Sequence, residues 1–354
     1  MEKHSTIQDV ARVAGVSIAT VSRALSGGSV SERTREKVED AARQVDYRGV
    51  ASRPNSERGM NRSIAMVLSS QVSPYYAALC EGATAEAVRS GYRVLDLTYP
   101  EGTGIEMVMA DLLDLQPVGV LLAGFAVENA LNQETTRTCL QRLQKEMPLV
   151  AIGPPIEGIE CARLTSDPSQ CVRKAMAHLT MLGHRRIGFI GGVASARFSI
   201  IRESAYIEEG KRFGCDDDPG LIMRTGVNAQ AGELGMSILL GNRRRALYPT
   251  AVFCINDLVA LGAMKEIQKS GLRVPEDIAV VGCDNAFFAA YLTPSLTTVD
   301  LHPFDHGRSA MSELVMSIHA GHPISFNQAF ESSLIVRESC GASLGVRHFS
   351  AELT

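Results

Sequence analysis

The sequence predicts an N-terminal all-α helix-turn-helix headpiece followed by an α/β domain built from two parallel-sheet lobes. At the N-terminus, two short segments of helical periodicity are joined by Gly15, a residue type that can end a helix in the left-handed conformation. From Ser63 onward, short apolar runs typical of buried strands alternate with segments of helical periodicity, which indicates βαβ units. This alternation occurs twice in succession, so we expect two lobes that face each other across a cleft.

The composition is that of a globular protein without a membrane segment. The chain has 354 residues, of which 45% are apolar and 21% charged, and this length suits two or three structural units. It contains no apolar run of about 18 residues, and its N-terminus lacks the charged and apolar regions of a signal peptide. We therefore expect a cytoplasmic protein with no membrane association.

The headpiece begins with two helices whose exposed residues are suited to DNA. The first helix follows Thr6, and the second has Ser17 as its N-cap. Val21 and Leu25 lie one turn apart and form the buried face of the second helix. The residues on its other face have small side chains or side chains with hydrogen-bond donors, as a helix that enters the major groove requires. That face consists of Ile18, Ala19, Ser22 and Arg23. The alternative is a pair of ordinary core helices joined by a glycine turn.

The rest of the N-terminal region predicts a third helix and a linker. The third helix is expected from Ser31 to about Val45, and Tyr47 ends a headpiece of residues 1–47. Residues 48–62 are rich in Gly, Pro, Ser and charged residues, which predicts a hinge or linker. The first 60 residues carry more Lys and Arg than Asp and Glu, whereas the remainder of the chain is acidic. A basic N-terminal region joined to an acidic remainder is suited to contact DNA phosphates through the N-terminal region alone.

The region 63–340 predicts alternating strands and helices. Apolar runs predict strands at 64–68, 93–97, 119–123, 149–152, 186–190, 251–254 and 278–281. Helical periodicity predicts helices at about 75–90, 104–115, 132–146, 168–182, 200–213, 228–240 and 257–270. We expect lobe 1 to comprise about 63–162 and 297–325, lobe 2 about 163–296 and 326–340, and a tail 341–354.

A ligand site is expected where the strands end. Ligands of parallel sheets bind outside the carboxyl ends of the strands, and several polar or aromatic residues follow these ends. Directional amides and carboxylates, the rigid fork of arginine and the flat face of tyrosine together suit a small polyhydroxylated ligand. The candidate residues are Tyr75, Tyr76, Arg197, Arg202, Asn256, Asp257 and Asp284. Several also have a structural interpretation: Asp257 could cap a helix, Arg202 could pair with Glu203 or a nearby carboxylate on the lobe surface, and the tyrosines could be packing residues.

Several long segments resemble the lactose/galactose repressor (LacI/GalR-type) family of bacterial transcription regulators. In the headpiece, the resemblance is carried by residues 6–25 and 30–38. Beyond it, the resemblance is carried by 185–192, 251–263, 271–282 and 292–298. The resemblance covers nearly the whole chain in order, and it implies a periplasmic-binding-protein-like fold for the two lobes.

The resemblance also implies a function. It implies a repressor that binds a palindromic operator in double-stranded DNA as a homodimer and responds to a small effector, carbohydrate or nucleoside-like. Asn256 and Asp284 fall where family members hydrogen-bond effector hydroxyls, and Arg202 falls where an arginine lines the cleft. Residues expected to contact DNA are Thr6, Ser17, Ile18, Ala19, Thr20, Ser22, Arg23, Ser31, Arg53 and Asn55. The alternative is a small-molecule (sugar) binding protein without a DNA-binding role.

The chain departs from the family pattern at the hinge and in the ligand site. In the hinge, Gly49 stands where relatives have proline, and Ser56 stands where they have the leucine that wedges into the minor groove. Pro54 lies inside the same segment and is unfavourable within a helix, except in its first turn. In the ligand site, Cys283 replaces an aromatic residue, and no tryptophan is available to stack on a sugar.

Motifs for enzyme, metal or cofactor chemistry are missing from the sequence. No Walker-type loop occurs, and the Gly191-Gly192 pair lacks the spacing of a dinucleotide-binding motif. The eight cysteines contain no Cys-x-x-Cys pair, so we expect reduced thiols and neither a zinc site nor a disulfide framework. No metal-ligand pattern with carboxylates is formed by His178, His184, His302 and His306. We expect no enzyme activity, no cofactor and no metal.

Overall fold

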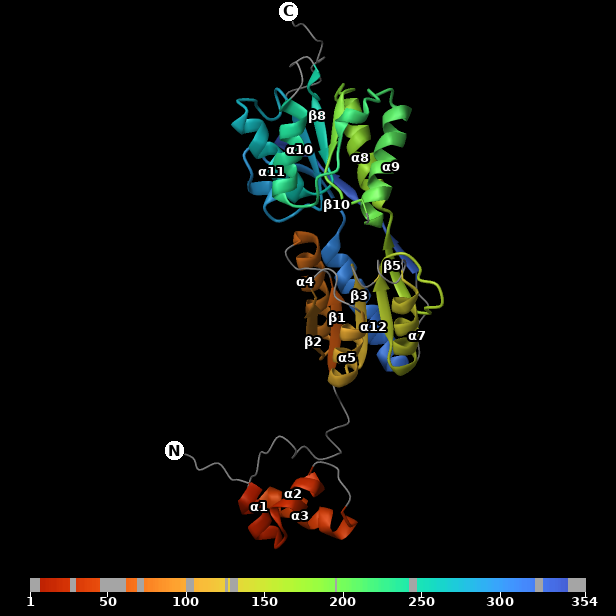
Figure 1. Ribbon diagram of the computed structural model, residues 1–354, viewed down its shortest axis with the longest axis vertical. Coiled ribbons are helices and arrows are strands. Elements are labelled where there is room, and N and C mark those ends of the chain that lie inside the picture. Colours follow the sequence, from red (N-terminus) through yellow and green to blue (C-terminus); the bar gives the residue numbers. More distant parts are fainter. Residues whose placement is uncertain are drawn as a thin grey trace, which may run out of the picture. The chain divides into compact units, whose positions relative to one another are not determined.

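The computed structural model describes residues 7–25, 30–44, 62–68, 73–99, 105–124, 127, 133–194, 196–241, 247–321 and 327–342. The chain divides into two compact units, residues 1–61 and 62–354, which are described separately below (Figure 1). Among the described helices, none is long and apolar enough to cross a membrane.

The N-terminal unit contains three helices around a small core. These are α1 (Ile7–Ala14), α2 (Ile18–Leu25) and α3 (Glu32–Gln44). Gly15 has a φ of +61° between the first two, so the tight turn uses the conformational freedom of glycine as predicted. The buried side chains are small or β-branched, which allows three short helices to approach closely: Val10, Ala11, Ala14, Val21, Ala24, Val38, Ala41 and Ala42. The helix-turn-helix and the third helix of the sequence prediction are confirmed within the described residues.

Lobe 1 is built on a six-stranded sheet in which all neighbouring strands are parallel. Its strand order is β11-β5-β4-β3-β1-β2. The strands are β1 (Ser63–Leu68), β2 (Arg93–Thr98), β3 (Gly119–Ala123), β4 (Leu149–Ile152), β5 (Ala162–Ser166) and β11 (Asn327–Phe330). Successive side chains of β1 pack on opposite faces of the sheet: Ala65 and Val67 belong to the core on one face, and Ile64 and Met66 belong to the core on the other. A strand buried on both faces explains why its sequence is a continuous apolar run.

In the described part of lobe 1, four helices cover the two faces of this sheet. On one face lie α5 (Ile105–Leu115) and α7 (Glu134–Glu146), and on the other lie α4 (Pro74–Arg89) and α12 (Pro303–Ala320). The last pair is in very close contact, because a Cβ atom added to Gly82 would lie 2.0 Å from the carbonyl oxygen of Phe304. A helix 18 residues long and late in the chain thus completes the first lobe.

Lobe 2 has a second six-stranded sheet of order β12-β10-β9-β8-β6-β7, parallel except for its β10–β12 pair. The strands are β6 (Ile187–Ile190), β7 (Ile222–Met223), β8 (Ala251–Cys254), β9 (Ala279–Cys283), β10 (Thr297–Asp300) and β12 (Ser333–Ile335). The helices are α8 (Pro168–Met181), α9 (Arg197–Arg212), α10 (Ala229–Gly241) and α11 (Asp257–Lys269). One large core joins these elements.

The described chain passes from one lobe to the other three times: between β5 and α8, between β10 and α12, and between β11 and β12. We call these stretches the crossing segments. Their positions correct the expected lobe boundaries. β5 belongs to lobe 1, although a boundary at residue 162 would have placed most of it in lobe 2. β10 pairs with β9 and therefore belongs to lobe 2, although the range 297–325 was expected in lobe 1. β11 returns to lobe 1 before β12 ends in lobe 2, which corrects the range 326–340. The strand partners, not the order of the chain, decide these assignments.

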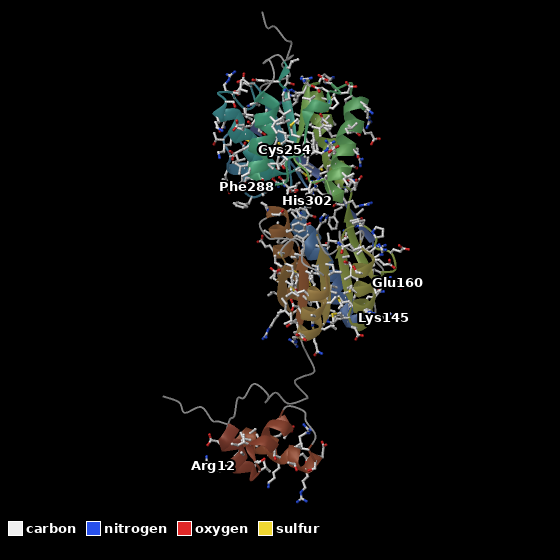
Figure 2. The ribbon with its side chains drawn as sticks, in the orientation of Figure 1. Arg12, Lys145, Glu160, Cys254, Phe288 and His302 are labelled. Carbon is white, nitrogen blue, oxygen red and sulfur yellow. The ribbon has the colours of Figure 1, made fainter. Side chains whose placement is uncertain are left out.

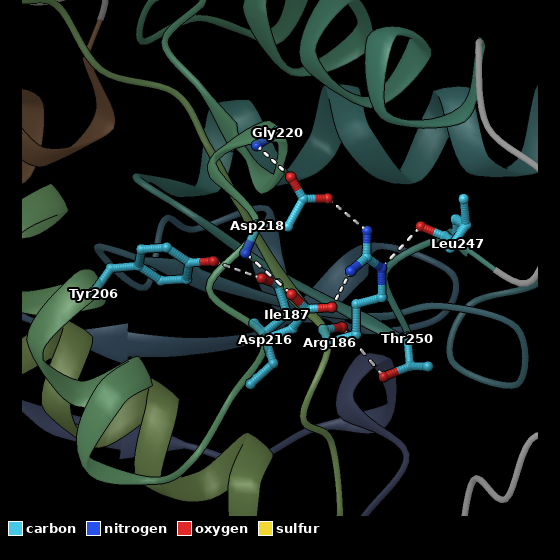
Figure 3. A network of polar contacts seen from close by, with 8 residues as sticks. All are labelled: Arg186, Ile187, Tyr206, Asp216, Asp218, Gly220, Leu247 and Thr250. Carbon is cyan, nitrogen blue, oxygen red and sulfur yellow. Dashed lines mark hydrogen bonds and ion pairs between the residues drawn. The ribbon is translucent and has the colours of Figure 1, made fainter.

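A polar network closes the end of lobe 2 at which its strands begin (Figure 3). Arg186 precedes β6 and forms ion pairs with Asp216 and Asp218, and its Nε donates to the carbonyl oxygen of Leu247 over 2.9 Å. Tyr206 Oη donates to the carbonyl oxygen of Ile187 over 2.6 Å. These groups hold loops together at the amino end of β6. The candidate site is expected at the opposite, carboxyl end of the sheet, where ligands of parallel sheets bind.

Candidate functional site

Serine side chains begin both the second and the third helix of the N-terminal unit. Ser17 Oγ accepts a hydrogen bond of 3.1 Å from the Thr20 amide, and Ser31 Oγ accepts one of 3.2 Å from the Thr34 amide. Both serines thus act as N-caps, as the sequence predicts. The remaining amides of each first turn point outward along a helix dipole that favours anions such as DNA phosphates.

The exposed face of α2 is partly described. Val21 is fully buried, whereas Ile18 is 47% exposed, so Ile18 lies on the outer face of the helix as the sequence predicts. Thr20 is half-buried. The side chains of Ala19, Ser22 and Arg23, and residues Thr6, Arg53 and Asn55, lie outside the described part, so their DNA contacts stay predictions.

In the α/β unit, Tyr75 lies between the two lobes. It is in the first turn of α4, and its ring packs against the cores of both lobe 1 and lobe 2. Tyr76 meets Tyr75 edge-on, with ring centroids 5.2 Å apart, and packs on the lobe 1 core only. Burial raises the pKa of Tyr75, and the neighbouring Tyr76 and Asp284 raise it further. Tyr75 therefore keeps its hydroxyl proton and remains a neutral hydrogen-bonding group.

Arg202 is buried in α9 near Tyr75. Only 7% of it is exposed, and its Nη1 donates to the carbonyl oxygen of Ile255 over 2.6 Å. Its Nε has no hydrogen-bond partner among the described residues, although it is buried. The expected alternative of a surface pair with Glu203 is wrong, because Glu203 binds Arg224 through two bonds of 2.6 and 2.7 Å. Arg202 is thus a buried cation whose Nε donor is unused among the described residues.

Asp284 follows β9 in a strained backbone conformation. Its φ of +111° is rare for a residue with a side chain, and its amide donates to the carbonyl oxygen of Val299 over 2.8 Å. Burial raises the pKa of Asp284 to about 7, while the charge of Arg202 and a hydrogen bond from Cys283 oppose this. Strain of this kind persists where the surroundings impose it, which is characteristic of binding sites.

Asn256 and Asp257 have positions that correct the expected helix cap. Asn256 is the N-cap of α11, since its Oδ1 accepts from the Val259 amide over 2.9 Å. Asp257 is not the cap: it is buried, and its two carboxylate oxygens accept from Thr298 Oγ1 and the Ala286 amide over 2.6 and 2.7 Å. Burial raises its pKa, as does the charge of Asp284. Asp257 therefore positions the loop that carries Asp284.

The sequence-predicted ligand residues are only partly brought together. Tyr75, Arg202 and Asp284 are close enough for their charges to affect one another's pKa values. Arg197 begins α9 as an exposed side chain. Two buried thiols share this environment with Arg202 and Asp284: Cys283, which the sequence analysis placed in the ligand site, and Cys171, which it missed. Cys171 carried no signal, because it lies in an otherwise ordinary helix.

The loop after Asp284 is hydrogen-bonded to the segments that cross between the lobes. Asn285 Nδ2 donates to Asp300 Oδ2 over 3.0 Å, and its Oδ1 accepts from Arg337 Nη2 over 2.8 Å. Asp300 Oδ1 accepts from the His302 amide, and His302 Nε2 lies 3.1 Å from Ser333 Oγ. Figure 2 shows His302 where lobe 1 and lobe 2 meet. A change at Asp284 can therefore reach two of the crossing segments through direct contacts.

His306 is a further buried residue that the sequence analysis did not select for ligand binding. It lies in the second turn of α12, is 1% exposed, and neither ring nitrogen has a hydrogen-bond partner among the described residues. Its ring meets Phe330 edge-on at 4.1 Å. Burial lowers its pKa to about 4, so the ring is neutral at pH 7 and can both donate and accept. The described residues contain no group of His, Cys, Asp and Glu that could hold a metal ion.

Two family models match the chain. The model described as "Bacterial regulatory proteins, lacI family" matches residues 6–49. The model described as "Periplasmic binding protein-like domain" matches residues 176–340. The first covers the three-helix unit, and the second covers most of lobe 2, α12 and β11 of lobe 1, and the last two of the three crossings between the sheets.

Curated relatives are transcription regulators that are similar over nearly their whole length. The HTH-type transcriptional repressor CytR of Escherichia coli (strain K12) is 32% identical over 347 residues, which are 96% of this chain and 98% of that protein. The HTH-type transcriptional repressor PurR of Vibrio atlanticus (strain LGP32) is 27% identical, over 89% of this chain and 92% of that protein.

Solved structures with the same architecture include complexes with operator and with sugar. The lac repressor dimer bound to operator and the anti-inducer ONPF has a TM-score of 0.70 at 25% identity, covering 96% of this chain and 99% of that one. The transcriptional regulator CelR–cellobiose complex has a TM-score of 0.69 at 29% identity, covering 95% and 100%. The two-part architecture is therefore shared by proteins that bind DNA and small ligands.

Proposed function

Because the chain belongs to the lacI family of bacterial regulatory proteins and is a DNA-binding transcription regulator, we propose that a small, neutral, hydroxyl-rich ligand bound between its lobes controls its affinity for operator DNA. The ligand class that fits is a sugar or a nucleoside. The protein is not an enzyme, as its close relatives are regulators.

The observation that carries this proposal is the presence of unused hydrogen-bonding atoms on Arg202 of α9 and His306 of α12. Arg202 Nε and both nitrogens of His306 are buried and have no hydrogen-bond partner within the described part of the chain, which is costly unless a bound molecule or water supplies one. They offer donors and one acceptor, and Asp284 adds an acceptor. Hydroxyl groups complement both kinds of atom, and the rings of Tyr75 and Phe330 suit the apolar face of a sugar ring.

The DNA-binding part of the proposal is a repressor that binds a palindromic operator as a homodimer in the cytoplasm. Two copies would each present one α2 helix to a half-site. Aromatic residues after β9 support a dimer, because 81% of Phe287 and 84% of Tyr291 are exposed, which is unusual for large rings outside interfaces. Sedimentation should give a dimer; a stable tetramer or a monomer at micromolar concentration would contradict it.

The ligand proposal is tested by selecting bound genomic fragments and then titrating candidate ligands. Substrates and products of the neighbouring genes supply the ligand panel. With the ligand found, Asp284→Asn and Arg202→Lys should weaken its binding in calorimetry while operator affinity in the absence of ligand stays unchanged. Arg212→Ala, at the exposed last residue of α9, is the matched control. Undiminished ligand binding by both cleft variants would overturn the proposed site.

The alternative, a sugar-binding protein with no DNA-binding role, is not favoured, because the lacI model matches residues 6–49 and the relatives are repressors. Salt-dependent gel shifts distinguish the two, since phosphate contacts make binding fall steeply with salt.

A further inference from the structure

We propose that lobe 2 carries a second small-molecule site, which binds a primary amine attached to a flat apolar group. The site is a cavity of about 350 Å³ beside the carboxyl ends of α10 and α11. We call it the α10–α11 pocket, and its lining includes Ser237, Leu240, Tyr248, Glu266, Ser270 and Leu272. It is separate from the ligand proposed between the lobes.

The pocket arises because two helices that touch near their beginnings leave a gap near their ends. In the first turn of α10, a Cβ atom added to Gly232 would lie 2.0 Å from the carbonyl oxygen of Val259 in α11, so the two backbones are in direct contact there. Farther along the helices, Ser237 of α10 and Glu266 of α11 line the open cavity. The fold of lobe 2 thus builds this pocket between two helices that pack tightly elsewhere.

The pocket lies away from the proposed inter-lobe site. α11 begins at Asp257, which holds the loop of Asp284, and it ends at Lys269 beside the pocket. A helix of 13 residues is roughly 20 Å long. Tyr248 follows Leu247, which belongs to the polar network at the amino end of β6 (Figure 3). A ligand in the pocket would therefore not compete with a ligand between the lobes.

Glu266 supplies a carboxylate to the pocket. Only 8% of the residue is exposed, and its Oε2 accepts a hydrogen bond of 3.2 Å from Lys269 Nζ. Among the described residues, no other side chain or amide donates to this carboxylate, so its Oε1 is available to a ligand in the cavity. A nearly buried carboxylate is costly unless its oxygens are paired, and an ammonium group forms a strong, charge-assisted bond with it. The Lys269 side chain is 70% exposed, so it can turn into solvent when a ligand enters.

The ends of the two helices also favour a cation. The last carbonyl groups of an α-helix have no partner within the helix, and its carboxyl end carries a partial negative charge. α10 ends at Gly241 and α11 ends at Lys269, both beside the pocket. The hydroxyl groups of Ser237 and Ser270 can accept further hydrogen bonds from an ammonium group. A cation in the pocket thus meets negative charge from Glu266 and from two helix ends, whereas an anion would be repelled.

Apolar side chains in the pocket determine the rest of the ligand. Leu240 and Leu272 are buried, and Tyr248 is half-buried. The tyrosine ring offers a flat surface on which an aromatic ring or a cation can pack. Sites for small ligands typically have about 300–1,000 Å³, mostly apolar, with a few polar groups that orient the ligand. An amine joined to a small aromatic ring complements both the apolar walls and Glu266.

The experiment titrates the full-length protein with phenethylamine in saturation-transfer difference NMR, with phenethyl alcohol as the neutral counterpart. The amine should bind with a dissociation constant in about the millimolar range, as expected for so small a ligand, and the alcohol should bind at least about tenfold more weakly. Glu266→Gln should weaken binding of the amine at least about tenfold, because it removes a charge-assisted hydrogen bond. Lys269→Ala removes a competing ammonium group and should tighten binding of the amine. Glu208→Gln, at an exposed carboxylate of α9, is the matched control.

Two further variants locate the amine. Ser237→Trp places a large ring at an exposed position of the pocket lining, so it should prevent binding in a protein that circular dichroism shows to be folded. Asp284→Asn, in the inter-lobe site, should bind the amine as the unmodified protein does. Equal binding of amine and alcohol, undiminished binding by Glu266→Gln, or loss of binding in Asp284→Asn would overturn the proposal. No binding of the amine at all would also overturn it, and this is the expected result if one of the arginines 243–245 occupies the pocket. These outcomes do not depend on whether a hydroxyl-rich ligand binds between the lobes.

Discussion

The carboxyl group of Asp284 should make the stability of the protein depend on pH. Burial raises its pKa from 3.8 to about 7 in the folded chain, against the opposing charge of Arg202. The unfolded chain ionises this group near its usual pKa, so between the two values the folded state keeps a proton that the unfolded state releases. The stabilising contribution is therefore complete below the unfolded pKa and lost as the pH rises through about 7. At about 1.36 kcal/mol per pKa unit, the loss from about pH 4.5 to about pH 8 is about 3 kcal/mol.

The measurement compares the unmodified protein with Asp284→Asn in urea unfolding at these two pH values, followed by circular dichroism. Asparagine cannot ionise and is among the residues that best tolerate a positive φ, so the variant removes the charge with little change of backbone. The unmodified protein should lose about 3 kcal/mol more than the variant. Asp217→Asn, at an exposed position, should keep the original pH dependence. Equal pH dependence in the unmodified protein and Asp284→Asn would refute the reasoning.

The remaining predictions concern DNA contacts, ligand contacts and coupling. Arg23→Ala should cost about 1–3 kcal/mol at the operator and flatten sequence preference in a binding-site selection, and an unchanged profile would remove Arg23 from the reading residues. His306→Leu removes buried atoms without partners, so thermal unfolding should be unchanged or occur at higher temperature while calorimetry shows weaker ligand binding. Asn285→Ala should leave ligand affinity within about threefold but reduce the effect of ligand on operator affinity, since it breaks the bond to Asp300. Pro54→Ala combined with Ser56→Leu should tighten operator binding and increase the bend in circular-permutation gel shifts; a sharp central kink in the unmodified protein would contradict this.

The elements that could be predicted from the sequence are those whose burial is visible locally. β1, β3 and β8 are buried at nearly every position, so their apolar runs identify them without any knowledge of their partners. β5 and β10 were missed as strands because they contain Arg, Thr, Ser or Asp, and β7 has two residues. Helix α12 was missed because His306, Glu313 and Ser317 interrupt its apolar face, yet all three are buried. The division of strands between lobes depends on pairing across the chain, which local periodicity does not contain.

The ligand site could be predicted only as far as its position. The carboxyl ends of strands led to Tyr75, Arg202 and Asp284, which share one environment in the structure. Asp257 was selected for the same reason, but its oxygens are used to hold the Asp284 loop. His306 enters the region from a helix that follows a crossing segment, and nothing in its neighbours along the chain indicates that it is buried without partners.

The location of Asp284 explains how a ligand could change the arrangement of the lobes. An effector shifts an equilibrium only by interacting differently with its two states, so the contacting group must itself change between them. Asp284 is held at an unfavourable φ, and the adjacent Asn285 bonds to Asp300 and Arg337, each beside a point where the chain leaves a sheet. If a ligand binds Asp284, we expect a change in this strain to reach Asp300 and Arg337 through the hydrogen bonds of Asn285. A carboxylate on a relaxed, isolated loop could bind the same hydroxyls, but it would have no such mechanical connection to the hinge.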